Sequence, residues 1–281
     1  MRTSIIGAGK VGMSLASHLL KKGILDYVFC RTDCYLSEFK HKIKKLEELE
    51  VKLQSCELLI ISVPDTQISN VATELANLPN YLLKDKLVFH CSGSLNENIL
   101  EPLRIIGAKT AAAHPLQTFS KIDDLLLHDI YWAVECTEKD KNVYIEYLKS
   151  IDGKPFFLNY NDKEQKILYH ASAVMASNFM HLYLEKAIEL AEKANLSREI
   201  FLPLCTQTLL NFFNSEISTL TGPVSRADIN TIKLHLELLN IYPDIKKFYQ
   251  TNSVILSDLA LKAEIINQDQ FSDLSKILLK K

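Results

Sequence analysis

Short apolar runs alternate with longer amphipathic stretches over the first 158 residues of the chain. These runs are rich in β-branched and aromatic residues, which is typical of strands. Strands that alternate with helices predict βαβ units and a largely parallel sheet. The run 58–63 is apolar almost throughout, so we expect it at the centre of the sheet, with helices on both faces. The predicted strands are residues 3–6, 27–30, 58–63, 87–91, 109–113, 131–134 and 155–158.

After residue 158 the pattern changes to long helical periods. Residues 164–193 contain neither proline nor glycine and predict one unbroken helix. Further helices are predicted over residues 196–214, 225–239, 244–266 and 273–281. The sequence therefore predicts a doubly wound α/β domain over residues 1–158 and an all-α domain over residues 159–281. A basic run at residues 40–45 is interpreted as the solvated face of a helix.

Composition narrows the choice of partners. A chain of 281 residues can bury a sufficient core without disulfides or a structural metal. Its net charge of −2 favours neither nucleic acid nor an anionic membrane as a partner, and no apolar run could span a bilayer. The six cysteines show no CxxC spacing, which argues against a metal site and indicates reduced thiols. We expect a cytoplasmic protein without a secretory segment.

A glycine-rich turn joins the first predicted strand to the first predicted helix. Its sequence is Gly7-Ala8-Gly9-Lys10-Val11-Gly12, the dinucleotide-binding fingerprint. Gly7 permits the tight turn, Gly9 lets the backbone approach a pyrophosphate, and Gly12 lets helix and strand pack closely. The helix start adds amide donors. We expect a nicotinamide dinucleotide here, with a turn that binds no ligand as the alternative.

The end of the second strand predicts which dinucleotide is preferred. An NAD site usually has Asp or Glu there, about 20 residues after the glycines. This strand is followed by Arg31 and Thr32, whose guanidinium and hydroxyl could hold a 2′-phosphate. NADP is therefore favoured. Asp33 leaves NAD open, and an ordinary exposed charge is the alternative role for Arg31.

The turn Val63-Pro64-Asp65 follows the apolar strand 58–63. Loops at the carboxyl ends of strands line the ligand crevice, so these residues are expected to border the nicotinamide ribose. Asp65 is also expected to be the N-cap of a helix over residues 66–78. Capping alone would explain Asp65 equally well.

Three further strings carry a family resemblance: residues 113–119 (AHPLQTF), 176–179 (ASNF) and 220–228 (LTGPVSRAD). Together with the fingerprint they resemble a bacterial family that joins a Rossmann-like domain to a helical domain of unknown function. The first half is similar to the NADP-binding domains of pyrroline-5-carboxylate reductase, deazaflavin-dependent NADP oxidoreductases and the 6-phosphogluconate dehydrogenase group. The resemblance implies an NADP-dependent oxidoreductase whose helical domain forms a homodimer, as in 6-phosphogluconate dehydrogenase. It implies no substrate.

His114 is the main catalytic candidate. Pro115 keeps it extended at the end of a strand, where it is expected to face the nicotinamide. Prephenate dehydrogenases, which share the glycine turn, use a histidine in a similar His-Pro setting to accept the hydroxyl proton. By that resemblance His114 is a general acid or base, and Ser94 hydrogen-bonds the same oxygen, while Gln117 and Thr118 orient the substrate. The alternative is that His114 ties its loop to nearby backbone.

The long predicted helix carries further polar candidates. His170, Val174, Ser177 and His181 recur at helical spacing and should share one face, with Asn178 beside it. We interpret this face as one wall of a cleft in which His170 and Asn178 are catalytic candidates and Ser177 binds substrate. Core histidines with satisfied hydrogen bonds are the alternative. Val174 stands where β-hydroxyacid dehydrogenases have a lysine four residues before their asparagine, so their mechanism does not carry over.

Arg226 lies just after the Gly222-Pro223 turn. Ser225 and Asp228 are expected to form a capping box, which leaves Arg226 to bind a substrate carboxylate. A surface salt bridge is the alternative. The leading hypothesis is hydride transfer between NADP and a small polar substrate at the domain interface. A cyclic-imine reductase and an NADP(H)-binding sensor without turnover are the competing hypotheses.

Overall fold

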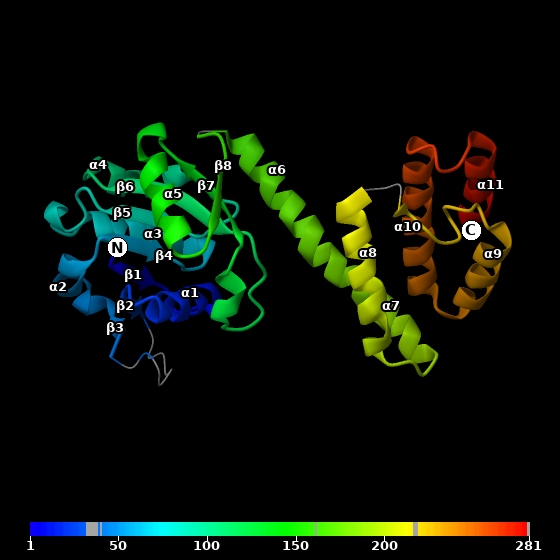
Figure 1. Cartoon of the computed structure of the whole chain (residues 1–281), viewed down its shortest axis with the longest axis horizontal. Helices are drawn as coiled ribbons and strands as arrows, with labels where there is room; N and C mark the ends of the chain where they lie inside the picture. Colours follow the sequence, from blue (N-terminus) through cyan, green and yellow to red (C-terminus); the bar gives the residue numbers. More distant parts are fainter. Residues whose placement is uncertain (32–38, 40, 161, 216–218, 280–281) are drawn as a thin grey trace. The chain divides into compact units, whose positions relative to one another are not determined.

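An eight-stranded sheet forms the first half of the chain, with the strand order β3-β2-β1-β4-β5-β6-β7-β8 (Figure 1). Neighbouring strands pair in parallel, except that β6 and β7 are antiparallel. The predicted Rossmann-like sheet is therefore confirmed, with β4 in its interior. The strands are β1 Thr3–Ile6, β2 Leu25–Cys30, β3 Ile43–Lys45, β4 Leu58–Ile61, β5 Leu87–His90, β6 Lys109–Pro115, β7 Tyr131–Cys136 and β8 Lys154–Phe157.

This computed structural model describes residues 1–31, 39, 41–160, 162–215 and 219–279. Its contacts divide the chain into two compact units, Met1–Asn178 and Phe179–Lys281. The domain division at residue 158, expected from the sequence, stays a prediction. Within the described residues, the length and apolar character that a membrane-spanning helix needs are not combined in any helix.

Strand β4 shows why the sheet has two covered faces. Its residues alternate between two hydrophobic cores: Leu58 and Ile60 belong to one, Leu59 and Ile61 to the other. All four side chains are completely buried, as a continuous apolar strand requires. Helices α1 and α5 contribute to the first core and helices α3 and α4 to the second. These helices are α1 Lys10–Lys21, α3 Asp65–Ala76, α4 Glu101–Ile105 and α5 Lys141–Ser150.

The basic run at residues 40–45 was predicted to be a helix face. This prediction is wrong for its last three residues, which form a strand. Residues Ile43–Lys45 form β3, which pairs with β2 through Val28 and Ile43. An edge strand needs only one hydrogen-bonded side and tolerates lysines, so charge did not exclude a strand. The acidic residues that follow begin short helical turns, η2 Leu46–Glu48, α2 Leu49–Lys52 and η3 Leu53–Ser55.

The predicted helix over residues 164–193 is interrupted. Helix α6 Lys163–Val174 is followed by a π-helical turn at Met175–Phe179 and then by α7 Met180–Lys193. A π turn holds one more residue than an α turn. The α-helical spacing that placed His181 on the face of His170 and Ser177 therefore does not run through this segment, and that part of the prediction is wrong.

All regular secondary structure among the described residues of the second unit is helical, which confirms the predicted helical half. Residues from α9, α10 and α11 form its core, among them Ile232, Leu236, Ala260 and Leu274. Its further helices are α8 Leu202–Ser215, α9 Ile229–Leu238, α10 Pro243–Lys262 and α11 Gln268–Leu278. Short 3₁₀ turns complete the chain: η4 Asn80–Leu82, η5 Glu97–Leu100, η6 Asp124–Leu127, η7 Glu138–Asp140, η9 Arg198–Phe201 and η11 Leu239–Ile241.

An aromatic cluster at β5 and β7 offers a test of this packing. Trp132, the only tryptophan of the chain, is fully buried and meets the ring of Phe89 edge-on at 6.2 Å. A Cβ at Gly153 would lie 2.7 Å from the indole atoms Cδ1 and Nε1. No side chain fits there unless the indole moves.

We expect Gly153→Ala to lower the free energy of unfolding by about 1–3 kcal/mol, because it overpacks the core against Trp132. Urea unfolding followed by the fluorescence of Trp132 measures this loss. Gly9→Ala is a matched control, since a Cβ at Gly9 meets no atom of the described part of the chain within 4 Å, and it should change the stability by less than about 1 kcal/mol. Equal stabilities for the two variants would contradict the packing argument.

Candidate functional site

The glycines of the turn have two different roles, close packing and the provision of open space. A Cβ at Gly7 would lie 2.1 Å from the carbonyl oxygen of Ser62, and one at Gly12 would lie 2.1 Å from that of Gly7. Gly7 also has a φ of +111°, in the region that favours glycine. Among the described residues, no atom lies within 4 Å of a Cβ placed on Gly9. Packing thus requires Gly7 and Gly12, whereas Gly9 leaves open space beside the start of α1.

That space continues into a cavity of about 270 Å³. Arg31 lies on its wall, where its Nη1 donates to Oε1 of Gln67 at 3.3 Å and its Nη2 lies 3.9 Å from Oε1 of Glu74. The cavity brings together most of the residues predicted for cofactor binding, while Thr32 and Asp33 lie outside the described residues. Its lining is Ile6, Gly7, Ala8, Gly9, Phe29, Cys30, Arg31, Leu46, Val63, Pro64, Gln67 and Val71.

Asp65 has a different role from the predicted N-cap. Helix α3 begins at Asp65 itself, with Pro64 in the cap position and no capping hydrogen bond from a side chain. The carboxylate Oδ2 instead accepts hydrogen bonds from the hydroxyls of Ser92 at 2.8 Å and Ser94 at 2.9 Å. The capping prediction is therefore wrong, because these two hydroxyls engage the carboxylate. The contact joins the start of α3 to the turn after β5.

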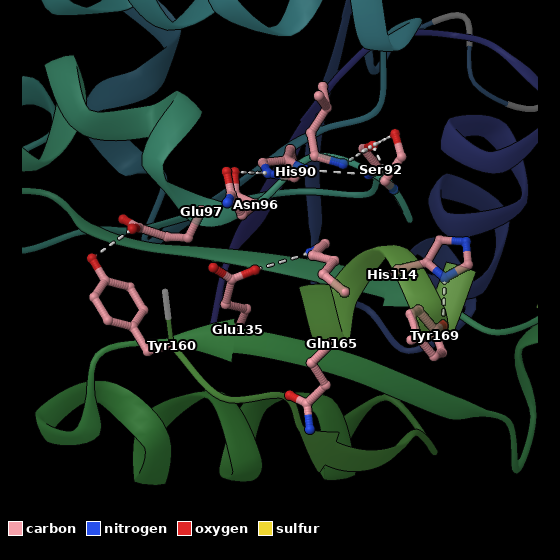
Figure 2. Close-up of polar contacts among 12 residues, drawn as sticks. His90, Ser92, Asn96, Glu97, His114, Glu135, Tyr160, Gln165 and Tyr169 are labelled. Carbon is pink, nitrogen blue, oxygen red and sulfur yellow. Dashed lines mark hydrogen bonds and ion pairs between the residues drawn. The ribbon is translucent and has the colours of Figure 1, made fainter. Parts of the chain in front are cut away.

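His114 lies at the carboxyl end of β6, as its sequence predicts, and contacts helix α6. Figure 2 shows its imidazole beside Tyr169, whose hydroxyl is 2.7 Å from Nδ1 of His114. The ring of His170 meets that of His114 edge-on, with 6.0 Å between the centroids. Both contacts lie within the first unit.

His170 packs against the turn between Ser92 and Ser94. Its Nδ1 is buried and has no hydrogen-bond partner within the described residues. A Cβ at Gly93 would lie 2.5 Å from this Nδ1 and 3.1 Å from Cε1 of His114. Only a glycine at position 93 allows both imidazoles to approach the backbone so closely.

A buried ion pair joins helix α6, which carries Tyr169 and His170, to strand β7. Nζ of Lys166, on α6, lies 3.3 Å from Oε2 of Glu135, on β7, and each side chain is 2% exposed. Burial lowers the pKa of Lys166 and raises the pKa of Glu135, while their mutual attraction opposes both shifts. A separate buried carboxylate, Glu97, accepts a hydrogen bond from the hydroxyl of Tyr160 at 2.9 Å (Figure 2).

Burial and nearby charge keep the side chains of His114 and Tyr169 uncharged. Desolvation, assisted by the proximity of His170 and Lys166, lowers the pKa of His114 to about 4. Desolvation raises the pKa of Tyr169 to about 12. Near pH 7 the imidazole is therefore uncharged and the phenol keeps its proton. When the phenol donates to Nδ1, the ring proton of His114 lies on Nε2.

The other substrate-binding candidates are more dispersed. Oε1 of Gln117 accepts from the backbone N–H of Thr118 at 2.8 Å, a purely local contact. Ser177 and Asn178 lie in the π turn after α6, and Asn178 is exposed. The structure thus brings His114 and His170 together but shows no hydrogen bond between them and Gln117.

The predicted capping box around Arg226 is wrong. Helix α9 begins at Ile229, and its N-cap is Asp228, which accepts from the N–H of Thr231 at 3.1 Å. The left-handed backbone of Ala227, with a φ of +49°, prevents an earlier helix start. The hydroxyl of Ser225 donates to the carbonyl of Gly222 at 3.0 Å, and Arg226 is exposed in the second unit.

Comparison with known protein families divides the chain in a similar way. Residues 1–115 match a Rossmann-like domain, and residues 130–254 match a family described as Domain of unknown function (DUF2520). The two matches follow one another along the chain. His114 lies in the segment that matches the Rossmann-like domain, whereas Tyr169 and His170 lie in the segment that matches DUF2520. No curated protein matches the sequence.

Solved structures share the fold over almost the whole chain. A Bacteroides fragilis protein with the provisional description NADP oxidoreductase is 24% identical, with a TM-score of 0.72 over 91% of this chain and 97% of that one. A reductive aminase from Aspergillus terreus in complex with NADPH is 16% identical, with a TM-score of 0.61 over 99% and 92%. Pyrroline carboxylate reductase from Plasmodium falciparum with NADP bound is 16% identical, with a TM-score of 0.57 over 98% and 98%.

Sequence reasoning missed Tyr169, Gly93 and the pair Lys166 and Glu135. Glu135 did leave a signal, since it is a buried acidic residue inside the otherwise apolar strand β7. A buried acid requires a partner, and this fact could have prompted a search for a lysine. Tyr169 and Gly93 left no comparable signal, because their contacts with His114 and His170 exist only in the folded chain.

The lowered pKa of His114 predicts a loss of stability in acid. Its folded-state pKa of about 4 lies below the ordinary value of 6.5, so the unfolded chain binds a proton in this range that the folded protein excludes. The stability contribution is complete above pH 6.5 and is lost as the pH falls toward 4. His90, with a pKa lowered to about 3, acts in the same direction.

NMR titration of the imidazole signals measures the pKa of His114 directly. In a urea-unfolding series, His114→Gln should make the fall in stability between pH 6.5 and 4 shallower by at most about 1.4 kcal/mol per pH unit. A pKa of 6.5 or above for His114 in the folded protein would contradict the proposed electrostatics.

Proposed function

We propose that the chain is an NADP-dependent oxidoreductase that transfers hydride to or from a small polar substrate beside His114. The observation that carries this proposal is the hydrogen bond between His114, at the carboxyl end of β6, and Tyr169 of helix α6. The glycine turn lies at the carboxyl end of β1 in the same sheet. Ligands of doubly wound sheets bind at this edge. The NADPH and NADP bound to two proteins of this fold support the choice of cofactor.

The residues around the cavity are suited to this cofactor. Gly7, Ala8 and Gly9 would hold the pyrophosphate, with amide donors from the helix start at Lys10, Val11 and Gly12. Arg31, together with Thr32, would pair with the 2′-phosphate. Val63, Pro64 and Asp65 would border the nicotinamide ribose. When bound, the cofactor supplies or accepts the hydride.

His114 would move the proton that accompanies hydride transfer. Its uncharged imidazole can donate from Nε2 to a substrate oxygen during reduction, or accept a proton at Nε2 during oxidation in the tautomer that carries its own proton on Nδ1. Tyr169 would position the ring by hydrogen-bonding Nδ1. The further catalytic candidates are Ser94, Asn178 and His170, and the substrate contacts are proposed at Gln117, Thr118, Ser177 and Arg226.

Reduction of a cyclic imine is the second candidate function. The likeness to a pyrroline carboxylate reductase favours it. The two functions differ in the bond reduced, C=O or C=N. Parallel screening of small carbonyl compounds and cyclic imines for NADPH oxidation therefore separates them. NADPH binding without turnover of either class would favour a sensor.

We also propose a homodimer formed through the second unit, by likeness to the helical domain of 6-phosphogluconate dehydrogenase. Helix α8 exposes large apolar side chains, with Leu204 63%, Phe212 53% and Phe213 80% exposed. Such a surface is typical of an interface between subunits. Light scattering at micromolar concentration should report twice the chain mass of 31.9 kDa, and a monomer would contradict this assignment.

Arg31→Ala should weaken NADPH binding about tenfold or more and leave NADH binding nearly unchanged. A charge-assisted hydrogen bond to the 2′-phosphate contributes on the order of 1.5–3 kcal/mol, and NADH has no such phosphate. Fluorescence titration of both nucleotides measures the two affinities. Arg198→Ala, which removes an exposed arginine of the second unit, is the control. Equal NADPH and NADH affinities in the parent protein would refute the cofactor preference.

With a substrate identified by the screen, His114→Asn should reduce kcat by roughly 10²–10⁴ and leave the NADPH dissociation constant unchanged. Tyr169→Phe should reduce kcat less, because it removes only the hydrogen bond that positions the ring. Single-turnover kinetics and NADPH titration measure the two effects separately. Turnover of His114→Asn at the parent rate, or loss of cofactor binding together with the fold, would exclude the catalytic role.

A further inference from the structure

A second group of histidines and acids lies in the first unit, apart from both the glycine-turn cavity and the contacts of His114. His18 belongs to the last turn of α1, Asp124 begins η6, and His128 follows η6. One nitrogen or oxygen of each of the three residues lies within 4.8 Å of the others. The rings of His18 and His128 meet edge-on, with their centroids 4.8 Å apart.

Hydrogen bonds fix which nitrogen of each ring can bind a cation. Nε2 of His18 is 3.0 Å from the carbonyl oxygen of Ile151, which can only accept, so His18 donates from Nε2. Nδ1 of His128 lies 3.1 Å from the carboxylate Oδ2 of Asp152, and Nε2 of His18 lies 3.5 Å from that same oxygen. The lone pairs therefore remain on Nδ1 of His18 and Nε2 of His128.

Asp152 thus has the position of the carboxylate that orients metal-binding histidines in known sites. The side chain of His18 is buried and therefore held in place by its neighbours. The side chain of His128 is 50% exposed and has room to change its rotamer.

Two lysines pair with the acids of this group. Nζ of Lys21 lies 2.7 Å from Oδ2 of Asp124, and Nζ of Lys22 lies 2.7 Å from Oδ1 of Asp152. The side chain of Lys21 is 64% exposed, and an exposed ion pair of this kind contributes little to stability. A divalent cation can therefore displace Lys21 from Asp124, while the pair of Lys22 and Asp152 leaves Oδ2 facing the histidines.

We propose that His18, His128 and Asp124 bind a divalent transition-metal ion of the zinc class, with Asp152 orienting both imidazoles. Two imidazoles and one carboxylate are a donor set that zinc accepts. Bonds of about 2.0–2.2 Å require ligand atoms roughly 3.4 Å apart, so the group closes slightly on binding. The ion would fasten α1 to the segment 124–128. The spacing of the cysteines gives no sign of this site, and only the fold brings these histidines together.

Isothermal titration of tag-free protein with Zn²⁺ tests the proposal. The parent should bind one ion per chain, and His128→Gln and Asp124→Asn should each weaken binding about tenfold or more. Asp152→Asn should weaken it about 10–100-fold while leaving the ligands in place. Asp129→Asn is the matched control: it removes one carboxylate beside His128, but that side chain is 82% exposed and pairs with Lys154, so its affinity should equal the parent's.

Thermal unfolding gives a second readout. Zn²⁺ should raise the melting temperature of the parent and of Asp129→Asn, and should not raise that of His128→Gln. Co²⁺ should give visible absorption bands with the parent that are lost in His128→Gln. Equal Zn²⁺ affinity in the parent and in His128→Gln, or loss of binding in Asp129→Asn, would overturn the assignment.

Discussion

The buried ion pair between Lys166 and Glu135 determines where α6 lies on the sheet. Both charges are removed from water, so each is stable only while the other is within reach. Loss of one partner from such a pair costs about 3–5 kcal/mol. The pair therefore fixes the position of α6 against β7. Tyr169 and His170 lie about one helical turn after Lys166 on the same helix, and the same constraint presents them to His114.

The chemical character of the candidate site follows from this arrangement. Burial is the main cause of the lowered pKa of His114, and the nearby Lys166, which pairs with Glu135, further disfavours a positive charge there. The phenol of Tyr169 is consequently protonated and the imidazole of His114 uncharged near pH 7. Gly93 completes it, because only a residue without a side chain allows His170 and His114 to pack against the same turn.

The glycine turn and Asp65 extend the site along the same edge of the sheet. Gly7 and Gly12 are required by the packing of β1, α1 and the backbone at Ser62, while Gly9 leaves space for a ligand. Asp65 holds the hydroxyls of Ser92 and Ser94 and so ties the turn after β5, which contains Gly93, to α3. The cavity near Arg31 and the group around His114 are thus connected through α3 and the turn after β5.

The sequence by itself determined the features that depend on local spacing. Apolar runs and the glycine fingerprint predicted the parallel sheet, the interior place of β4 and the turn that opens on the cavity, because strand periodicity and glycine geometry are local properties. The charged edge strand β3 and the helix start at Ile229 were mispredicted, since pairing with β2 and the backbone of Ala227 overrode composition. Only the tertiary structure decided the contact of His114 with Tyr169, the pairing of Lys166 with Glu135, and the hydroxyl partners of Asp65. Each joins residues far apart in the chain, and their approach depends on how whole elements pack, which no local pattern encodes.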